Sequence, residues 1–296
     1  MIKIWLLETR PQFLILDIVL AILGTSVAAF EGYFNLSYAL LGLLGLILIH
    51  ISVNALNDYF DFKSGIDLVA RRTPFSGGSG MIPAQKMKPC EVLCLGIVSF
   101  IMAVPVGVFF TLAKGWLLLP LLLIGALCVL FYTSLILKTP YPEWAAGLGL
   151  GLLPILGMYF IQTGFYSWDA LIATVPSFIL VYNLLFLNEF PDVEADRIGR
   201  RKTFPILLGK RAASINFTVM TVLMYLWVVI WIIAGVMPVF TLIVLLTVPL
   251  ALKAIKGALN YEDINQLMSG MANNVLTVLL AQLLIGIGYI LAILFA

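Results

Sequence analysis

Long apolar segments recur along this chain, and they constrain its fold more than any other feature. Hydropathy, interrupted by charged residues, Gly and Pro, divides the 296 residues into about nine segments of roughly 18 to 24 residues each. A helix of that length crosses the hydrocarbon core of a bilayer. The composition agrees, since 62% of the residues are hydrophobic and only 11% are charged. The sequence therefore predicts an all-α, polytopic membrane protein.

The predicted spans are 13–30, 37–56, 91–112, 116–137, 143–164, 169–189, 213–235, 238–255 and 272–295. The first is interpreted as a spanning helix and not as a signal peptide, because similar segments follow it. The longer loops are then 57–90, 190–212 and 256–271. No soluble appendage is expected, so residues 1–296 are predicted to form a single transmembrane domain.

Basic residues indicate the orientation of the spans. With the N-terminus inside, sixteen of the seventeen Lys and Arg residues fall on one side of the membrane, and only Lys114 falls on the other. Positive loop charge resists translocation. We therefore expect an integral protein of a prokaryotic plasma membrane, with the N-terminus and the long loops cytoplasmic and the C-terminus outside.

Two acidic clusters follow the second and the sixth predicted spans. The first reads Asn57-Asp58-Tyr59-Phe60-Asp61 and extends to Asp67, and the second reads Asn188-Glu189-Phe190-Pro191-Asp192 and extends to Asp196. Basic residues come after each cluster, namely Arg71, Arg72, Arg200, Arg201 and Lys202. The similarity suggests a duplication, with pseudo-repeats over about 13–137 and 143–255 and a last helix over 272–295. Two four-helix repeats plus a ninth helix would place the clusters face to face across a central cavity.

The second cluster has the spacing of a metal site. Asn188, Asp192 and Asp196 recur every four residues, which places their side chains on one face if the sixth helix continues past its span. Neighbouring carboxylates repel each other unless a cation neutralises them, and oxygen ligands suit Mg²⁺. Two such sites would hold a diphosphate, whose remaining oxygens would bind the basic residues. A single cluster would be interpreted as a solvated surface, but two copies with the same pattern favour a binding site.

A diphosphate site beside apolar helices suits a polyisoprenyl diphosphate, which has an ionic head and a hydrocarbon tail. At these motifs, and over essentially the whole chain, the sequence resembles the UbiA superfamily of intramembrane prenyltransferases. The run Asn57 to Asp67 and the segment Asp196 to Thr203 are most similar to the branch that prenylates 1,4-dihydroxy-2-naphthoate in menaquinone synthesis. Many members have Asp at the position of Gly65, whereas the nearest carboxylate here is Asp67.

The resemblance and the spacing together assign roles to the polar residues. The candidate catalytic residues are Asp58, Asp61, Asp192 and Asp196. The candidate diphosphate-binding residues are Asn57, Arg71, Arg72, Asn188, Arg201 and Lys202. The candidate metal ligands are Asn57, Asp58, Asp61, Asp67, Asn188, Asp192 and Asp196, for two Mg²⁺ ions that bridge the diphosphate.

The resemblance implies that Mg²⁺ neutralises the leaving diphosphate and that an acceptor carbon attacks the allylic carbocation. Apolar helices and a lid over residues 71–89, with its Gly-Ser run 75–80, would exclude water. The expected partners are a polyisoprenyl diphosphate donor, an aromatic or lipophilic acceptor and the lipid bilayer. No nucleic acid and no obligatory protein partner are expected.

Other acceptors and activities stay open at this point. The acceptor could be 4-hydroxybenzoate or geranylgeranylglyceryl phosphate in place of the naphthoate. A phosphatidyltransferase also uses Mg²⁺ and aspartates, but its crowded Asp-Gly and Ala-Arg signature is missing from the sequence. A cation transporter would place its carboxylates near the bilayer midplane, whereas these clusters follow the ends of spans.

A few further polar residues lie in or near the apolar spans. Candidate cavity contacts are Tyr159, Asn183, Lys138 and Tyr141, for which helix packing or the membrane interface are the alternatives. Asp17 is expected to face the bundle interior, and the single histidine, His50, is assigned a helix-packing role. Gln162, Asn273 and Asn274 carry no assigned role. Three cysteines without metal-ligand spacing are interpreted as ordinary thiols.

Overall fold

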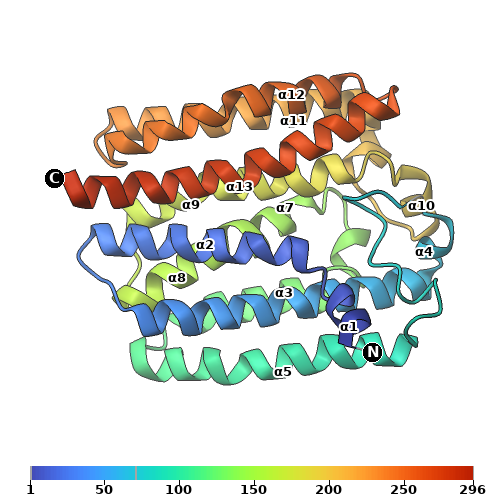
Figure 1. Cartoon of the computed structure of the whole chain (residues 1–296), viewed down its shortest axis with the longest axis horizontal. Coiled ribbons are helices and arrows are strands. Elements are labelled where there is room, and N and C mark those ends of the chain that lie inside the picture. Colours follow the sequence, from blue (N-terminus) through green and yellow to red (C-terminus); the bar gives the residue numbers. More distant parts are fainter. Residues whose placement is uncertain (1, 71, 296) are drawn as a thin grey trace.

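The chain folds into a bundle of helices in the computed structural model, which describes residues 2–70 and 72–295 (Figure 1). These residues contain helices and turns and no β-strand, so the all-α prediction is confirmed. In chain order the α-helices are α1 (Ile2–Glu8), α2 (Pro11–Phe30), α3 (Leu36–Ser64), α4 (Ile66–Val69), α5 (Pro89–Lys114), α6 (Leu118–Phe131), α7 (Glu143–Ala146), α8 (Leu153–Thr163), α9 (Trp168–Asn188), α10 (Val193–Ile198), α11 (Phe204–Ile233), α12 (Val248–Leu259) and α13 (Ile264–Phe295). A π-helical segment, Gly147–Leu152, joins α7 to α8, and 3₁₀ segments cover Ile136–Lys138 and Val239–Thr247.

Eight helical segments in the described part of the chain are long and apolar enough to cross a membrane. They include the joined segments Glu143–Thr163 and Val239–Leu259. The predicted span 116–137 corresponds to α6, which has 14 residues and ends where the chain turns after Phe131. At 1.5 Å per residue a helix of this length reaches about 21 Å, less than the core of a bilayer. The predicted count of nine spanning helices is therefore not confirmed.

Several element boundaries differ from the predicted spans, and the differences fall at the motifs. Helix α3 continues to Ser64, so the prediction that a loop begins at residue 57 is wrong, and the first acidic cluster lies on the helix. The helix ends because Gly65 adopts a left-handed conformation with φ of 86°. The predicted sixth span, 169–189, ends within one residue of α9, so the condition that the helix continues through the second cluster is not met. Helix α9 ends at Asn188 and α10 begins at Val193, with Pro191 in the intervening turn.

The long helices run along a common axis, and the two ends of the bundle differ (Figure 1). One end carries α1, α4, α10 and the segment 72–88, and the other end carries the C-terminal end of α13. Helix α13 packs against α2, α9 and α12, and α3 packs against α5. Between α2, α8, α9, α11 and α13 lies the largest apolar core.

The outer surface of the bundle is apolar. Large hydrophobic side chains remain exposed along α5, α6 and α11, among them Ile101, Leu112, Leu123, Leu127, Val222 and Ile230. A surface of this kind is unfavourable in water and suits contact with lipid chains. The exposed surface and the eight spans together make this chain an integral membrane protein.

Candidate active site

One face of α3 supplies the first wall of a cavity at the end of the bundle that carries α4 and α10. His50, Asn54, Asn57 and Asp61 follow each other at intervals of four, three and four residues, and all four line the cavity. Asn57 donates from Nδ2 to Asp61 Oδ2 at 3.1 Å and to Thr133 Oγ1 at 3.0 Å. After Gly65 ends the helix, the short helix α4 brings buried Asp67 to the same cavity.

The second acidic cluster forms the opposing wall although its helix is broken. Asn188 ends α9, Asp192 precedes α10, and Asp196 lies within α10, where its backbone N–H donates to the carbonyl of Asp192 at 2.8 Å. All three side chains line the same cavity as Asn57 and Asp61. Residues of the two clusters therefore line one cavity.

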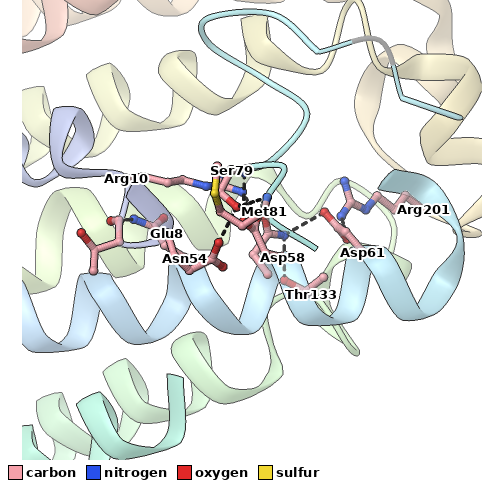
Figure 2. A network of polar contacts seen from close by, with 11 residues as sticks. Glu8, Arg10, Asn54, Asp58, Asp61, Ser79, Met81, Thr133 and Arg201 are labelled. Carbon is pink, nitrogen blue, oxygen red and sulfur yellow. Dashed lines mark hydrogen bonds and ion pairs between the residues drawn. The ribbon is translucent and has the colours of Figure 1, made fainter. Parts of the chain in front are cut away.

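Arg201 joins the two clusters directly. Its Nη1 donates to Asp196 Oδ1 at 2.7 Å, and its Nη2 forms an ion pair with Asp61. Figure 2 shows the guanidinium group beside Asp61 at the end of α3. Burial alone would lower the pKa of Arg201, but the charges of Asp61 and Asp196 outweigh it and raise the pKa. The group is thus a fixed cation between two carboxylates.

A second arginine holds the remaining carboxylate of the first cluster. Arg10, which precedes α2, forms an ion pair with Asp58, whose side chain is 1% exposed. Asp58 also accepts from the backbone N–H of Ser79 at 2.9 Å, and Ser79 Oγ donates to Glu8 Oε2 at 2.5 Å. Figure 2 shows this network where segment 72–88 lies on α3.

The Gly-rich segment lies over the cavity in this arrangement. Phe75, Ser76, Gly77 and Gly78 all line it. Gly78 has φ of +73°, and a Cβ there would lie 3.1 Å from Asp58 Oδ1. Any larger residue would thus be strained and would crowd the carboxylate. Residues 75–78 of the segment predicted as a lid therefore form part of the cavity wall.

The cavity is polar at one end and apolar along its walls. Its volume is about 240 Å³. Apolar walls come from α2, α6, α9, α13 and the Gly147–Leu152 segment, through Leu16, Val129, Leu150, Leu184 and Val278. A second, mainly apolar cavity of about 470 Å³ lies between α3, α5, α6 and α8 and shares Gly149 and Leu150 with the first. An ionic group and a hydrocarbon chain could both be held here.

The second cluster retains oxygen atoms without partners. Among the described residues Asn188 Oδ1, Asp192 Oδ1 and both carboxylate oxygens of Glu189 are buried and accept no hydrogen bond. Burial, and next the charge of Asp196, raise the pKa of Asp192 to about 7. Burial, and next the charge of Asp61, raise the pKa of Asp67 to about 6. Buried oxygens without donors are the ligands that a hard cation requires, so the residues present fit Mg²⁺.

The ligands are not already gathered around one point. No group of three or more His, Cys, Asp or Glu side chains in residues 2–70 and 72–295 converges closely enough to hold a metal ion. The arginine contacts are one reason, because Arg201 and Arg10 occupy carboxylate oxygens of Asp61, Asp196 and Asp58.

Several residues predicted from the sequence lie away from the cavity. Arg71 lies outside the described residues. Arg72 and Lys202 are exposed, and neither lines the cavity. Lys138 and Tyr141 are exposed as well. The side chains of Arg72, Lys202, Lys138 and Tyr141 therefore do not lie in the cavity with the carboxylates.

The buried polar residues among the predicted contacts have other partners. Tyr159 donates its hydroxyl proton to Glu31, and Gln162 accepts from the backbone N–H of Asn35 at 2.6 Å, both near the far end of the bundle. Asn183 donates to Thr221 Oγ1 at 2.9 Å. Packing between helices, the alternative given above, describes Tyr159 and Asn183 better than contact with the cavity. Similarly, Asn274 donates to the carbonyl of Asn183 at 3.1 Å.

Further residues around the site were missed in the sequence analysis. Glu8, Arg10 and Thr133 belong to the network but not to either motif. Only their position on the same predicted side of the membrane could have indicated Glu8 and Arg10. Glu189 lies within the second motif and lines the cavity, and burial raises its pKa well above the usual range. His50 lies in the wall with Asp17 bound to it, and Asp17 is buried as predicted.

Comparison with known sequences gives one family. A model of the UbiA prenyltransferase family matches residues 18–275. The chain is 30% identical over 287 residues to the 1,4-dihydroxy-2-naphthoate octaprenyltransferase of Bacillus subtilis (strain 168), covering 96% of this chain and 91% of that protein.

Solved structures share the fold over nearly the full length. A UbiA homolog from Aeropyrum pernix K1 aligns with a TM-score of 0.67 at 16% identity, covering 95% of this chain and 98% of that chain. A UbiA homolog from Archaeoglobus fulgidus, whose structure contains DMAPP and Mg²⁺, aligns with a TM-score of 0.58 at 15% identity, covering 94% and 98%.

Proposed function

Because the chain belongs to the UbiA prenyltransferase family, we propose that it transfers a polyisoprenyl group from its diphosphate to 1,4-dihydroxy-2-naphthoate, a step of menaquinone biosynthesis. The observation that carries the proposal is the cavity in which both acidic clusters face each other above apolar walls. The named activity of the Bacillus subtilis relative, which matches 96% of the chain, supports the naphthoate as acceptor.

In this proposal the carboxylates and amides of the two clusters hold two Mg²⁺ ions. The ligands would be Asn57, Asp61, Asp67, Asn188, Asp192 and Asp196, which line the cavity, together with Asp58, which does not line it and is paired with Arg10. Mg²⁺ supplies charge that stabilises the departing diphosphate. The Mg²⁺ and DMAPP in the Archaeoglobus fulgidus structure support this assignment.

Arg201 is the cation best placed to bind the diphosphate. It lies between Asp61 and Asp196 at the cavity wall, and guanidinium groups bind phosphate oxygens through paired N–H donors. Arg72 and Lys202, which were also predicted to bind diphosphate, are exposed here and would need to move inward. Arg71 stays a prediction outside the described residues.

The apolar part of the site would hold the isoprenoid chain and exclude water. A carbocation formed in contact with water would be captured, so the walls and the cover formed by residues 75–78 protect it. The second cavity continues the apolar surface past Gly149 and Leu150, and we assign it to the distal part of the chain. Ser79 keeps the cover in place, because its backbone N–H binds Asp58, which pairs with Arg10, and its hydroxyl binds Glu8.

The same proposal includes an orientation in the membrane. The end of the bundle that carries α1, α4 and α10 would face the cytoplasm of a prokaryotic cell, because sixteen of the seventeen basic residues are predicted on that side. Phosphorylated precursors are soluble there, and the apolar chain would lie in the bilayer. The C-terminal end of α13 would then face outside.

We also propose an internal duplication, because the two acidic clusters have similar sequences and similar positions in the fold. Each acidic cluster occurs at the end of a long helix that is followed by a short one, α3 by α4 and α9 by α10. The two short helices also pack against each other. This arrangement supports two related halves that contribute one cluster each.

The test is transfer from radiolabelled geranylgeranyl diphosphate by purified protein with Mg²⁺, with 1,4-dihydroxy-2-naphthoate, 4-hydroxybenzoate and geranylgeranylglyceryl phosphate as separate acceptors. We expect a lipid product with the naphthoate that disappears in EDTA. A product with another acceptor alone would keep prenyl transfer and overturn the naphthoate. No product, and no Mg²⁺-dependent binding of the donor by folded protein, would contradict the proposal.

A further inference from the structure

A buried His-Asp pair lies in the cavity wall away from the carboxylate clusters. His50 Nδ1 on α3 lies 3.0 Å from both carboxylate oxygens of Asp17 on α2. The two residues are 4% and 1% exposed. Asp17 is buried within a membrane-spanning helix, where an ionisable group without a partner is costly. His50 itself lines the cavity that contains both acidic clusters.

The position of His50 relative to the clusters suits the acceptor and not the diphosphate. It precedes Asn57 by seven residues on the same face of α3, which corresponds to about 10 Å along the helix axis. A diphosphate held at Asn57 and Asp61 would direct its hydrocarbon chain toward the apolar walls. The space beside His50 is then where an aromatic ring could approach the reacting carbon.

The contact with Asp17 determines which ring nitrogen is available. A carboxylate only accepts hydrogen bonds, so Nδ1 carries the proton that Asp17 receives. Nε2 is then the basic nitrogen. Within residues 2–70 and 72–295 no hydrogen bond uses Nε2, and the ring lies at the cavity surface. A histidine that is oriented by a carboxylate and has a free nitrogen in a cavity has the arrangement of a general base.

We propose that His50 Nε2 accepts the hydroxyl proton of the aromatic acceptor during prenyl transfer, and that Asp17 is a positioning residue that holds the imidazole in this tautomer. The inference rests on the proposed function, because it needs an acceptor with a ring hydroxyl. It adds a catalytic residue outside both acidic motifs.

The step balances without any further reactant. The ring carbon forms a bond to the allylic carbon, the allylic C–O bond breaks, and its electron pair leaves with diphosphate. The hydroxyl proton moves to Nε2, which leaves the ring as a neutral cyclic ketone. When the attacked carbon carries a carboxylate, loss of CO₂ returns an electron pair to the ring, and the ketone oxygen takes its proton back from His50. The imidazole is then neutral again.

A purely structural role is the competing explanation, because the pair also joins α2 to α3. The chain offers a matched control in Ser177 and Gln282, which form a buried hydrogen bond of 2.5 Å between α9 and α13. Neither residue lines the cavity. Loss of this hydrogen bond should therefore affect helix packing but not the binding or the prenylation of the acceptor.

The experiment compares His50→Gln, Asp17→Asn and Gln282→Leu with wild type in the naphthoate transfer assay, with KM determined for donor and acceptor separately. We expect His50→Gln to lower kcat by about 10²-fold at pH 7, as is typical for loss of a general base, with the donor KM unchanged. Asp17→Asn should show a smaller loss in the same direction. Gln282→Leu should keep wild-type kcat and KM. Its unfolding temperature is measured separately to show how much the lost packing contact destabilises the protein.

A pH series separates proton transfer from packing. A phenolic hydroxyl ionises near about pH 10, so a base is needed less as the pH rises. The ratio of wild-type to His50→Gln rates should therefore fall between pH 7 and pH 9.5. Asp17 is the charged group that contacts His50, and other charged groups line the same cavity, namely Arg10, Asp61, Asp67, Glu189, Asp192, Asp196 and Arg201. Because both proteins retain those groups, the ratio reports on His50.

Three outcomes overturn the inference. If His50→Gln matches Gln282→Leu in kcat, or if its defect is constant with pH, the pair is structural. If wild-type protein binds the donor but transfers to no hydroxyl-bearing aromatic acceptor, the proposed function fails first and the inference fails with it. The wild-type arm thus distinguishes the two failures.

Discussion

The two acidic clusters contain similar ligands but differ in their charge balance. In the first, on the continuous helix α3, Asp58 pairs with Arg10 and Asp61 pairs with Arg201. In the second, where the helix breaks at Pro191, Asp196 shares Arg201 with the first cluster, but Asp192 Oδ1 and Asn188 Oδ1 have no partner among the described residues. Carboxylates neutralised by the protein stabilise the fold, whereas buried oxygens without partners lower stability until a cation binds. The first cluster thus supports the structure more, and the second is better prepared to bind a metal ion.

The largest effect expected from this difference between the two clusters is the loss of activity when one carboxylate of either cluster is removed. Asp61→Ala and Asp192→Ala should each lower turnover by about 10³-fold or more, because each removes a ligand from one of two sites that the reaction needs. Their effects on stability should differ. Asp61→Ala removes one of the two carboxylate partners of the mostly buried Arg201, whereas Asp192→Ala removes a carboxylate that forms no ion pair among the described residues and whose Oδ1 is buried without a donor.

The measurement is radiolabel transfer together with the unfolding temperature in detergent and EDTA. Glu194→Ala, which replaces an exposed carboxylate on α10, is the control for both. Full activity in either Asp variant would contradict the two-site proposal. Equal destabilisation by both Asp variants would remove the contrast between the clusters.

The second effect concerns the cation that both clusters share. Arg201→Ala should leave the buried carboxylates of Asp61 and Asp196 without their cationic partner, and breaking a buried ion pair costs about 3–5 kcal/mol. Arg197→Ala is the matched control, because its ion pair with Glu194 spans 3.9 Å between exposed side chains and should contribute about 0–1 kcal/mol. Denaturant unfolding in EDTA measures both. Similar losses for the two variants would show that Arg201 does not neutralise the clusters.

This contrast could be predicted from the sequence only in part. Spacing identified Asn57 and Asp61, because side chains four residues apart on a helix share a face. It also identified Asn188, Asp192 and Asp196, although these three residues lie at the end of α9, in the turn and on α10 and not on one helix. All five indeed line one cavity. The class of fold followed from hydropathy, because apolar length is a local property of the chain.

What could not be predicted depends on contacts between distant segments. Arg10 and Asp58 are 48 residues apart, and Arg201 and Asp61 are 140 residues apart. No local pattern specifies which arginine reaches which carboxylate. The end of the sixth span was predicted at residue 189, one residue after the observed end of α9 at Asn188, and Pro191 in the turn agrees with it. His50 was assigned to packing because its partner, Asp17, lies on another helix.

A smaller effect is the response of Asp192 to pH. Its folded pKa of about 7 lies above the ordinary value of 3.8, so the folded state holds this proton where the unfolded state has lost it. Stability from this group is therefore present at low pH and is lost as the pH rises through about 7. In EDTA, Asp192→Asn should unfold at a higher temperature than wild type at pH 8, by several degrees, since about 1 kcal/mol corresponds to about 2–4 °C. The difference should shrink toward pH 5.

Asp263→Asn provides the control for this series. Hydrogen bonds from Gln266 and Asn265 lower the pKa of the Asp263 carboxylate, so it stays ionised from pH 5 to pH 8 in both folded and unfolded protein. Its difference from wild type should not change over that range. A pH-independent difference for Asp192→Asn as well would mean that the second cluster is solvated and not poised for a cation.

The smallest effect concerns the cover over the first cluster. Ser79→Ala removes the hydroxyl that donates to Glu8 Oε2 at 2.5 Å but keeps the backbone bond to Asp58. Glu8 is fully buried, and its Oε1 has no partner among the described residues, so the carboxyl group would lose its last side-chain donor. A loss of about 1–2 kcal/mol is expected, against little change for Thr139→Ala, whose hydroxyl bonds a carbonyl at an exposed turn. Limited proteolysis within residues 72–88 should speed up in Ser79→Ala, because the cover opens more often. Unchanged proteolysis would show that Arg10 and Asp58 hold the cover alone, and the paired state of the first cluster would then depend on one ion pair.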